Sequence, residues 1–261
     1  MSKQLSKQLK KVIPWGVPIL LILIWQFLVQ SGIVPTRVLP APTAVLEAGV
    51  KLAASGELWR NLYVSAVRAF TGFLIGGSIG FVLGLLNGLF PVAERFLDTS
   101  LQMLRNIPHL ALIPLVILWF GIGEAAKLFL VAIGVLFPIY LNTYYGVHTV
   151  DKGLIEMGKV YGLKPLELFW QIILPSALPS ILIGVRFALG IMWLTLIVAE
   201  TIAADSGIGY MAMNAREFLQ TDVVVFSILL YALLGKLADV AARLLEERLL
   251  QWHPSYQTTT A

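Results

Sequence analysis

The chain has 261 residues, of which 58% are hydrophobic and 13% charged, whereas soluble domains carry about 45–50% apolar and about 25% charged residues. This composition excludes an ordinary water-soluble globular protein. The formal charge of +4 does not indicate nucleic-acid binding, because Lys and Arg lie mainly at the ends of apolar blocks. The chain contains no cysteine, which excludes disulfides, thiolate metal sites and cysteine nucleophiles.

Six apolar blocks approach the length that a helix needs to cross a bilayer, which is about 20 residues. They cover residues 12–30, 70–90, 108–122, 127–147, 177–203 and 223–240. The blocks predict an all-α integral membrane protein with a single membrane domain. The first block follows Lys3, Lys7, Lys10 and Lys11 as in a signal peptide, but no small-residue cleavage pattern comes after Gln30, so we expect a retained helix.

Lys and Arg are enriched in the cytoplasmic segments of membrane proteins. In this topology more of them lie on the side of the membrane that holds the N-terminus than on the opposite side. Both termini are therefore predicted to be cytoplasmic. This gives a cytoplasmic N-terminus (1–11), a first transmembrane helix (12–30), an external loop (31–69), a core transmembrane domain (70–240) and a cytoplasmic tail (241–261). In the external loop, residues 58–68 have a helix-like pattern and predict an ordered cap. The cytoplasmic loop 148–176 is too apolar for a linker, which indicates a surface for a partner protein.

Glycine recurs every four residues along the second block. The stripe consists of Gly72, Gly76, Gly80, Gly84 and Gly88. Such a stripe allows another helix to approach closely, so these residues are predicted to serve helix packing.

A second pair of glycines, Gly207 and Gly209, follows the fifth block. They predict a turn over residues 205–210 on the outer side, either close to an outer gate or as an ordinary connection.

Ionisable residues inside apolar blocks are costly in a bilayer and need a partner or a function. Arg186 is expected to face the interior of the bundle, either along an anion pathway, or paired with an acidic side chain such as Asp239 or extended to the cytoplasmic interface. Lys236 lies three residues before Asp239, so the two can pair within one helix. Glu200 is predicted to lie near the outer end, within reach of Lys127.

No pattern in the sequence supports catalysis or a cofactor. Residues 153–160 match a phosphate-binding loop except that Val160 replaces the Ser or Thr that binds magnesium, and no strand precedes them. Residues 76–80 match a nucleophile elbow but lie within the glycine stripe. The three histidines, His109, His148 and His253, lack metal-site spacing. We expect no enzyme activity, no cofactor and no metal.

The cytoplasmic loop carries one specific motif. Glu156-Met157-Gly158, Gly162 and the segment 172–175, which ends in Leu174 and Pro175, resemble the EAA signature of ABC importer permeases: Glu-Ala-Ala, three residues, Gly, nine residues, Ile-x-Leu-Pro. Met157 and Gly158 differ from the alanines of the signature. Gly162 suits a backbone with positive φ, Pro165 suits the first turn of a helix, and Pro175 is expected to end that helix, so the motif predicts two helices at an angle.

The resemblance extends to other segments and is strongest to the aliphatic sulfonate permeases, which belong to one subfamily with nitrate, taurine and bicarbonate permeases. The segments are 104–121, 184–190, 200–202 and 206–218. It implies a six-helix type I importer permease with a MetI-like core in the bacterial inner membrane. It also implies a homodimer with the pathway between subunits, two ATPase subunits and a periplasmic solute-binding protein. Nucleotide would bind to the ATPase and not to this chain.

In the family the elbow in the cytoplasmic loop docks in a cleft of the ATPase. The resemblance therefore predicts a contact core of Glu156, Tyr161, Gly162 and Leu163, supported by Leu174 and Pro175. Two other classes stay open on the residues alone. A secondary transporter driven by an ion gradient would need paired repeats and broken helices, and a membrane-embedded enzyme would need a catalytic cluster.

Overall fold

The computed structural model describes residues 2–202 and 204–253, with side chains from Gly16 onward, and these residues form helices without any strand. The helices are α1 (Ser2–Gln30), α2 (Pro42–Ala54), α3 (Glu57–Leu89), α4 (Pro91–Arg105), the 3₁₀ helix η1 (His109–Leu112), α5 (Ile113–Phe120), α6 (Glu124–His148), α7 (Lys152–Val160), α8 (Pro165–Leu168), the π-helix η2 (Phe169–Ile173), α9 (Leu174–Ile202), α10 (Ile208–Glu217) and α11 (Thr221–Leu249).

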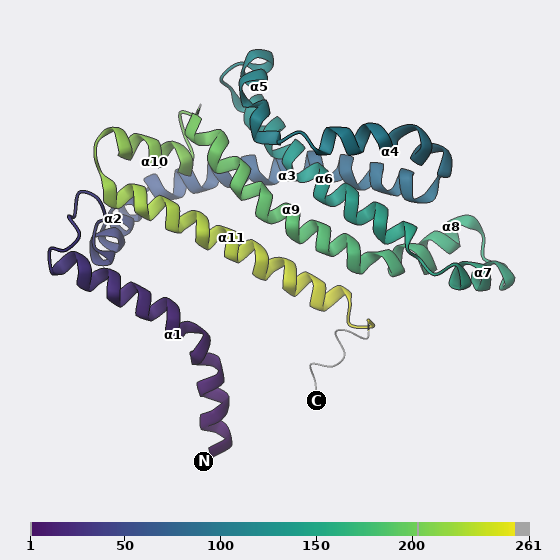
Figure 1. The fold of residues 1–261 in the computed structure, drawn as a ribbon, viewed down its shortest axis with the longest axis horizontal. Helices are drawn as coiled ribbons and strands as arrows, with labels where there is room; N and C mark the ends of the chain where they lie inside the picture. Colours follow the sequence, from purple (N-terminus) through teal and green to yellow (C-terminus); the bar gives the residue numbers. More distant parts are fainter. Residues whose placement is uncertain (1, 203, 254–261) are drawn as a thin grey trace.

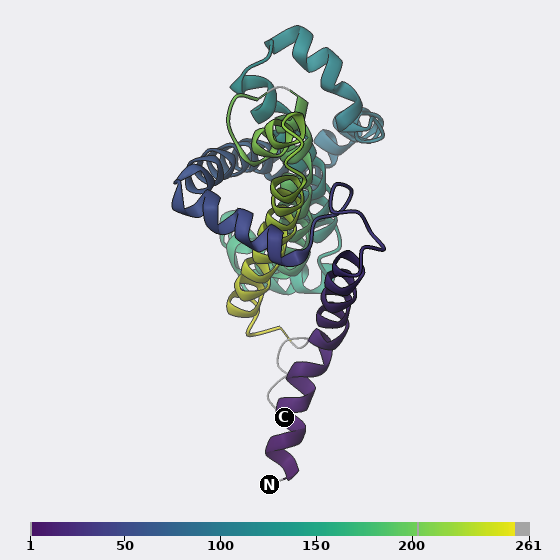
Figure 2. The same ribbon diagram turned by 90° about the vertical axis from the view of Figure 1, so that its left-hand side faces the viewer.

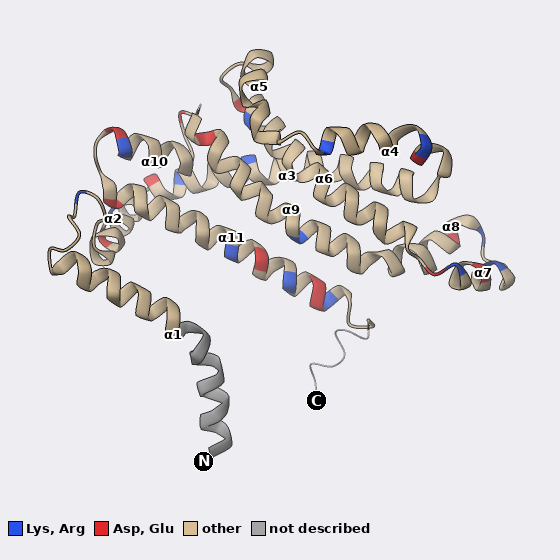
Figure 3. Cartoon of the chain, in the orientation of Figure 1, with Lys and Arg blue, Asp and Glu red and all other residues tan. Residues whose placement is uncertain are grey.

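The long helices α3, α6, α9 and α11 run along the long axis of the molecule (Figure 1). One end of the bundle carries α2, α10 and the start of α3, and we call it the outer end; the opposite end carries α7 and α8 and is called the elbow end. Charged residues gather towards these ends and along the second half of α11 (Figure 3). The core between the helices contains Ala69 of α3, Val131 and Val135 of α6, and Ala188 and Met192 of α9, all fully buried.

Four helical segments are long and apolar enough to cross a membrane: α3, α6, the continuous segment Pro165–Ile202 and α11. A fifth would be α4 together with η1 and α5, which are bent by 81° at the break between them. η1 and α5 cover the helical part of the predicted short span 108–122, and they are long enough to cross a membrane only together with α4, so this span stays a prediction. Pro108 follows the end of α4 and lacks the N–H that a continuing helix needs, so the chain changes direction there.

The first predicted span lies in α1, which leaves the bundle close to α2 and extends away from it (Figures 1 and 2). Its described apolar part is the helix Gly16–Gln30. The side chains of residues 12–15 lie outside the described part of the chain, as does residue 1. The span and the cytoplasmic position of residues 1–11 therefore stay predictions.

The predicted external loop 31–69 contains α2 and the first turns of α3. The stretch that suggested a separate cap is the beginning of α3, which starts at Glu57, directly after Gly56 in the left-handed conformation (φ 82°). The polar residues Asn61, Ser65 and Arg68 reduce the hydropathy of this part of the helix, although all three are buried. Their partners inside the bundle, described below, explain how a polar stretch can continue a membrane helix.

The glycine stripe of α3 lies directly against α6. A methyl group at Gly76 would overlap the backbone of Ala132, and one at Gly80 would overlap the carbonyl of Leu136. Gly72, Gly84 and Gly88 likewise face α6 at Val131, Thr143 and Val147. The absence of side chains therefore sets the distance between the two helices.

The last helix extends beyond the predicted span 223–240 at both ends. α11 continues to Leu249, so the predicted tail 241–261 begins inside a helix. Apolar positions continue after Val240, and Ala242 and Leu250 are buried. Residues 254–261 of the predicted tail lie outside the described residues.

Candidate functional site

The elbow between α7 and α8 is built by a glycine that ends one helix. Gly162 has φ 83°, its N–H donates to the Lys159 carbonyl, and the Leu163 N–H donates to the Gly158 carbonyl, both at 3.0 Å. This is the Schellman arrangement, in which a left-handed residue closes the helix end. Pro165 then occupies the first turn of α8. The predicted turn and the predicted place of Pro165 are confirmed.

The inside of the elbow is tightly packed at Gly158. A methyl group there would come within 2.6 Å of Ile172 and 2.7 Å of Leu168, and within 3.3 Å of Leu163. The glycine that departs from the EAA signature thus lets α7 lie close to the following helix. The half-buried Leu163 belongs to this inner contact.

The outside of the elbow is apolar and exposed. Val160 and Tyr161 are 86% and 80% exposed, and Leu166 and Trp170 are exposed as well. Glu156 lies on the surface of α7. Because the elbow is predicted to lie in water, an apolar surface of this kind indicates a site for another protein.

Leu174 and Pro175 do not end the second helix, which corrects the expectation for Pro175. The helix is continuous from Pro165 to Ile202 and contains the π turn Phe169–Ile173 directly before Pro175. The Leu174 N–H donates to the Phe169 carbonyl, five residues back. The wider turn gives the proline ring room that a regular α-helix would not provide.

A buried ion pair joins α3 to α9 at the outer end. Arg68 Nη1 lies 2.9 Å from Glu200 Oε1, and its Nε lies 2.7 Å from Glu124 Oε2. The same guanidinium donates to the Ser206 carbonyl at 2.5 Å. Arg68 thus connects α3, α6, α9 and the turn before α10.

Glu200 accepts further hydrogen bonds. Ser65 Oγ donates at 2.8 Å, Tyr231 Oη at 3.0 Å and the Gly209 N–H at 2.9 Å. These donors satisfy a carboxylate that is almost fully buried. Burial of a charge is tolerated when it is paired and hydrogen-bonded in this way.

The two glycines of the outer turn approach this carboxylate. Gly207 has φ 111°, and its N–H donates to Asn61 Oδ1 at 2.9 Å. Its Cα faces the Glu200 carboxylate so closely that a methyl group would collide with it, and a methyl group on Gly209 would come within 2.5 Å of the Glu200 Cβ. Glu200, Gly207 and Gly209, which were predicted separately, therefore form one cluster.

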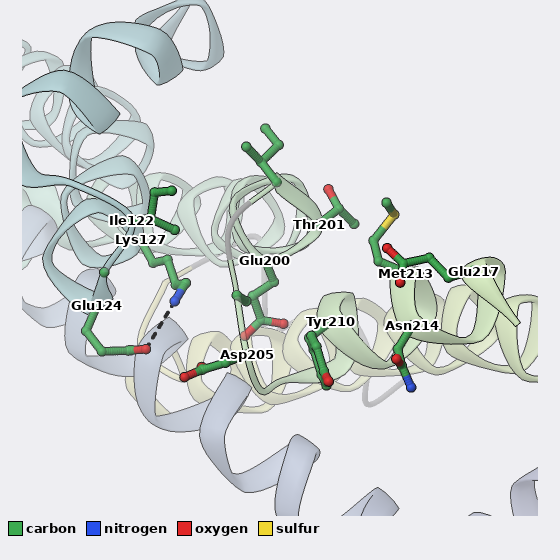
Figure 4. A pocket seen from close by; sticks show the side chains of 13 residues that line it. Ile122, Glu124, Lys127, Glu200, Thr201, Asp205, Tyr210, Met213, Asn214 and Glu217 are labelled. Atoms are coloured by element: carbon green, nitrogen blue, oxygen red, sulfur yellow. Dashed lines mark hydrogen bonds and ion pairs between the residues drawn. The ribbon is translucent and has the colours of Figure 1, made fainter.

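An open cavity of about 540 Å³ lies beside this cluster. Figure 4 shows Glu124, Lys127, Glu200, Asp205 and Tyr210 around it, with Lys127 bonded to Glu124. Lys127 Nζ lies 3.1 Å from Glu124 Oε1, so the predicted pairing of Lys127 with Glu200 is wrong. Arg68 takes that place because α3 begins earlier than expected and brings its first turns to the outer end.

The cavity has an acidic rim. Asp205 is exposed, and the Ser206 hydroxyl donates to its carboxylate at 3.1 Å, which lowers the pKa of that carboxyl. Glu217 and Asn214 of α10 complete the polar lining. Among the described residues there is no group of three or more His, Asp and Glu placed to hold a metal ion.

The predicted pairs around Asp239 are confirmed. Arg186 Nε lies 2.7 Å from Asp239 Oδ1, and Lys236 Nζ lies 3.4 Å from Asp239 Oδ2. Arg243 and Glu246 extend this group, at 3.2 Å from Asp239 and 3.7 Å from Arg186. Arg186 is half-buried and joins α9 to α11. It lies several helical turns before Glu200, the residue of α9 that belongs to the outer cluster.

Sequence reasoning missed Ser65, Arg68 and Tyr231 as partners of Glu200. A signal was present, because Asn61, Ser65 and Arg68 follow one another at spacings of four and three residues and so share one helix face. A polar stripe at the start of an apolar helix indicates buried partners once the helix is known to begin at Glu57.

The comparisons with known proteins agree with this architecture. Residues 76–251 match the family described as the binding-protein-dependent transport system inner membrane component. The chain belongs to this family. It is therefore a multi-pass inner-membrane permease of the ABC transporter type, as the elbow motif predicted.

Relatives within the family cover all or nearly all of the chain. The SsuC transport permease of Escherichia coli strain K12, named for aliphatic sulfonates, is 61% identical over 261 residues, which is all of this chain and 99% of the relative. SsuC of Bacillus subtilis strain 168 is 46% identical over 92% of this chain and 87% of its own length. The taurine transport permease TauC of E. coli is 34% identical over 93% of this chain and 90% of its own length.

Solved permease structures share the fold. The inward-facing MetNI methionine ABC transporter aligns with a TM-score of 0.53 and 21% identity over 73% of this chain and 94% of the solved chain. An amino acid ABC transporter crystallised with histidines aligns with a TM-score of 0.54 and 16% identity over 70% of this chain and 91% of the solved chain. The predicted type I importer permease fold is confirmed.

Proposed function

We propose that this permease forms the translocation pathway of an ATP-driven importer for aliphatic sulfonates. The observation that carries the proposal is the 61% identity to the E. coli SsuC permease across the entire chain. The lower identity to the taurine permease, 34%, favours simple aliphatic sulfonates over taurine as substrates. Nitrate and bicarbonate are the remaining alternatives from the resemblance of the sequence.

We infer that the importer contains two copies of this chain, two ATPase subunits and a periplasmic solute-binding protein. ATP hydrolysis takes place on the ATPase subunits, and both termini of the permease lie in the cytoplasm. The exposed apolar outside of the elbow supports the ATPase contact, because Val160, Tyr161 and Trp170 need a protein cover in water. In this arrangement Glu156 and Gly162 take part in the same contact.

We further propose that the outer cluster of Arg68, Glu200, Gly207 and Gly209 belongs to an outer gate. Its hydrogen bonds fix the turn before α10 to α3 and α9 beside an open cavity. Displacing that turn requires breaking several charge-assisted hydrogen bonds together, which favours two discrete positions over a continuous movement. A pathway role of Arg186 stays a prediction beside its structural pairing with Asp239.

Transport in proteoliposomes tests the proposed function. Permease, ATPase and binding protein would be reconstituted together, and uptake of ethanesulfonate, taurine, nitrate and bicarbonate compared with and without ATP inside the vesicles. We expect ATP-dependent uptake of ethanesulfonate above the other anions. Equal uptake without ATP would contradict an ATP-driven importer, and preference for another anion would reassign the substrate.

A further inference from the structure

Two tyrosines of α6 hold two carboxylates of α4. Tyr144 Oη donates to Glu94 Oε1 at 2.5 Å, and Tyr140 Oη donates to Asp98 Oδ1 at 3.4 Å. Glu94 and Asp98 are four positions apart in α4, as are Tyr140 and Tyr144 in α6, so each pair lies on one face of its helix. The first carboxylate in the sequence binds the second tyrosine, which means that the two helices run antiparallel. The tyrosine rings are stacked, with centroids 6.2 Å apart. We call these four residues the latch.

A buried amide supports the latch from α3. Asn87 is fully buried, and its Nδ2 donates to Tyr140 Oη at 2.9 Å. This bond occupies one acceptor position of the Tyr140 hydroxyl and directs its proton towards Asp98. The hydroxyl of Tyr140 therefore connects α3, α6 and α4 at one point.

Packing within this chain contributes little to the position of α4. None of its fifteen residues, all of which the structure describes, is buried. Phe96 and Met103 are among its exposed apolar side chains. An apolar cavity of about 260 Å³ lies between α4 and the bundle, lined by Leu101 and Leu104 of α4, Leu83 of α3 and Leu136 of α6. A helix above an open cavity can shift without the losses that close packing would impose.

The latch lies next to the elbow. The ring of Tyr144 contacts that of His148, the last residue of α6, with centroids 5.4 Å apart. Val147 of the same turn packs in one cluster with Ile173 and Leu174 at the other end of the elbow. Movement of the elbow therefore reaches the last turns of α6 through packed side chains.

The far end of α4 is fixed by a second polar contact. After the 81° break, His109 of η1 lies with Nε2 2.9 Å from Thr195 Oγ1 of α9. The latch thus holds the first turns of α4, and His109 holds the chain just after its last turn. The apolar cavity lies between these two points of attachment. Figure 1 shows α4 at the same end of the molecule as α7 and α8.

We propose that Tyr140 and Tyr144 are positioning residues for transport, whose hydrogen bonds to Asp98 and Glu94 pass the movement of the elbow to α4. The proposal rests on the proposed function, because it takes the elbow to be the contact with the ATPase. Because hydrogen bonds are directional, a displacement of α6 is passed to the paired residues of α4. A loosely packed apolar contact cannot pass it on in this way. α4 is then the part of the permease that follows the ATPase.

The test removes the two hydroxyls and keeps the rings. Tyr140→Phe/Tyr144→Phe would be compared with wild type in the complete importer, measuring ATPase retention, ATP hydrolysis stimulated by the binding protein, and sulfonate imported per ATP hydrolysed. We expect retention and hydrolysis to persist and import per ATP to fall about tenfold, the equilibrium factor of one hydrogen bond to a charged group, because the 3.4 Å bond of Tyr140 is weak beside the 2.5 Å bond of Tyr144. A merely structural role would not change this ratio.

Two variants serve as controls. Tyr145→Phe alters an exposed tyrosine next to the latch and should leave the ratio unchanged. Glu94→Gln keeps a carbonyl acceptor for Tyr144 and should retain more coupling than Glu94→Ala. An unchanged ratio in the double tyrosine variant would overturn the proposal. Absence of ATP-dependent import by the wild-type importer would instead contradict the proposed function.

Hydrogen exchange gives a readout that does not need the complete importer. Backbone exchange over residues 91–105 would be measured in the purified permease with and without the double substitution. We expect exchange in α4 to rise about tenfold when both hydroxyls are removed, and to rise more than exchange in α3 and α6, which lose only the contact between Asn87 and Tyr140. Unchanged protection of α4 would overturn the latch even where the variant fails to retain the ATPase.

Discussion

Arg68 of α3 and Glu200 of α9 lie 132 positions apart in the sequence and form a buried ion pair with 2.9 Å between Nη1 and Oε1. Their side chains are 4% and 0% exposed. The pair joins the first turns of one membrane helix to the last turns of another, at the end that carries α10. Its other partners, Glu124 and Ser206, bring α6 and the outer turn into the same network.

Removing one member of this pair should be far more damaging than removing both. Arg68→Met leaves the Glu200 carboxylate buried without its cation, and we expect a loss of about 3–5 kcal/mol in the free energy of unfolding. The double variant Arg68→Met/Glu200→Gln should recover much of it, because the uncompensated charge is gone while the amide oxygen still accepts from Ser65, Tyr231 and the Gly209 N–H. Thermal unfolding of the purified permease in detergent measures both.

A matched control is the exposed pair of Lys51 and Glu47, which also has a short distance of 2.9 Å. Lys51→Ala should leave the unfolding temperature unchanged, since an exposed pair in water contributes little. If the double variant is as unstable as Arg68→Met alone, the loss comes from packing of the arginine side chain and not from the unpaired carboxylate.

The glycine stripe gives a second prediction. Gly76→Ala places a methyl group against the backbone of Ala132, which cannot move aside as a flexible side chain could. We expect destabilisation at the upper end of the range of about 1–3 kcal/mol for overpacking. Gly235→Ala in α11, where nothing lies within 4 Å, should be neutral or slightly stabilising. Equal unfolding temperatures for the two variants would contradict close contact between α3 and α6.

Sequence reasoning predicted the helical class and the elbow well, because both depend on local signals. Apolar length indicates membrane helices, and Gly162 with Pro165 defines a turn that needs no distant contact. Sequence reasoning failed where contacts between residues that are distant in the sequence decide the structure. Arg68 reduced the hydropathy at the start of α3, and only its contact with Glu200 explains why the helix continues there. Pro175 looked like a helix end, but a π turn before it allows the helix to pass.

The cluster around Asp239 gives a third prediction. Arg186→Gln removes one of three cations that contact Asp239, while Lys236 and Arg243 stay within 3.4 Å and 3.2 Å of its carboxylate. We therefore expect a small loss of stability and import close to wild type. Uptake in proteoliposomes containing equal amounts of permease measures the second quantity. A loss of import about tenfold or more, with the unfolding temperature preserved, would give Arg186 the pathway role instead.

The last prediction concerns the elbow and its most sensitive residue. Gly162→Val introduces a β-branched side chain at φ 83°, a conformation that such residues adopt only with strain. The Schellman bonds from Gly162 and Leu163 should then be lost, and the direction of α8 relative to α7 should change. Space is not the reason, because nothing lies within 4 Å of a methyl group at this position.

A second substitution at Gly162 separates the effect of backbone conformation from the effect of side-chain volume. Asn tolerates the left-handed region better than other residues with a side chain, so Gly162→Asn should retain much of the function that Gly162→Val loses. Retention of the ATPase subunit and ATP hydrolysis stimulated by the binding protein would be measured in membranes with equal permease. We expect both to fall strongly for Gly162→Val and modestly for Gly162→Asn. Normal values for Gly162→Val would mean that the ATPase does not depend on the geometry of this elbow, and the exposed apolar surface around Tyr161 would then need another partner.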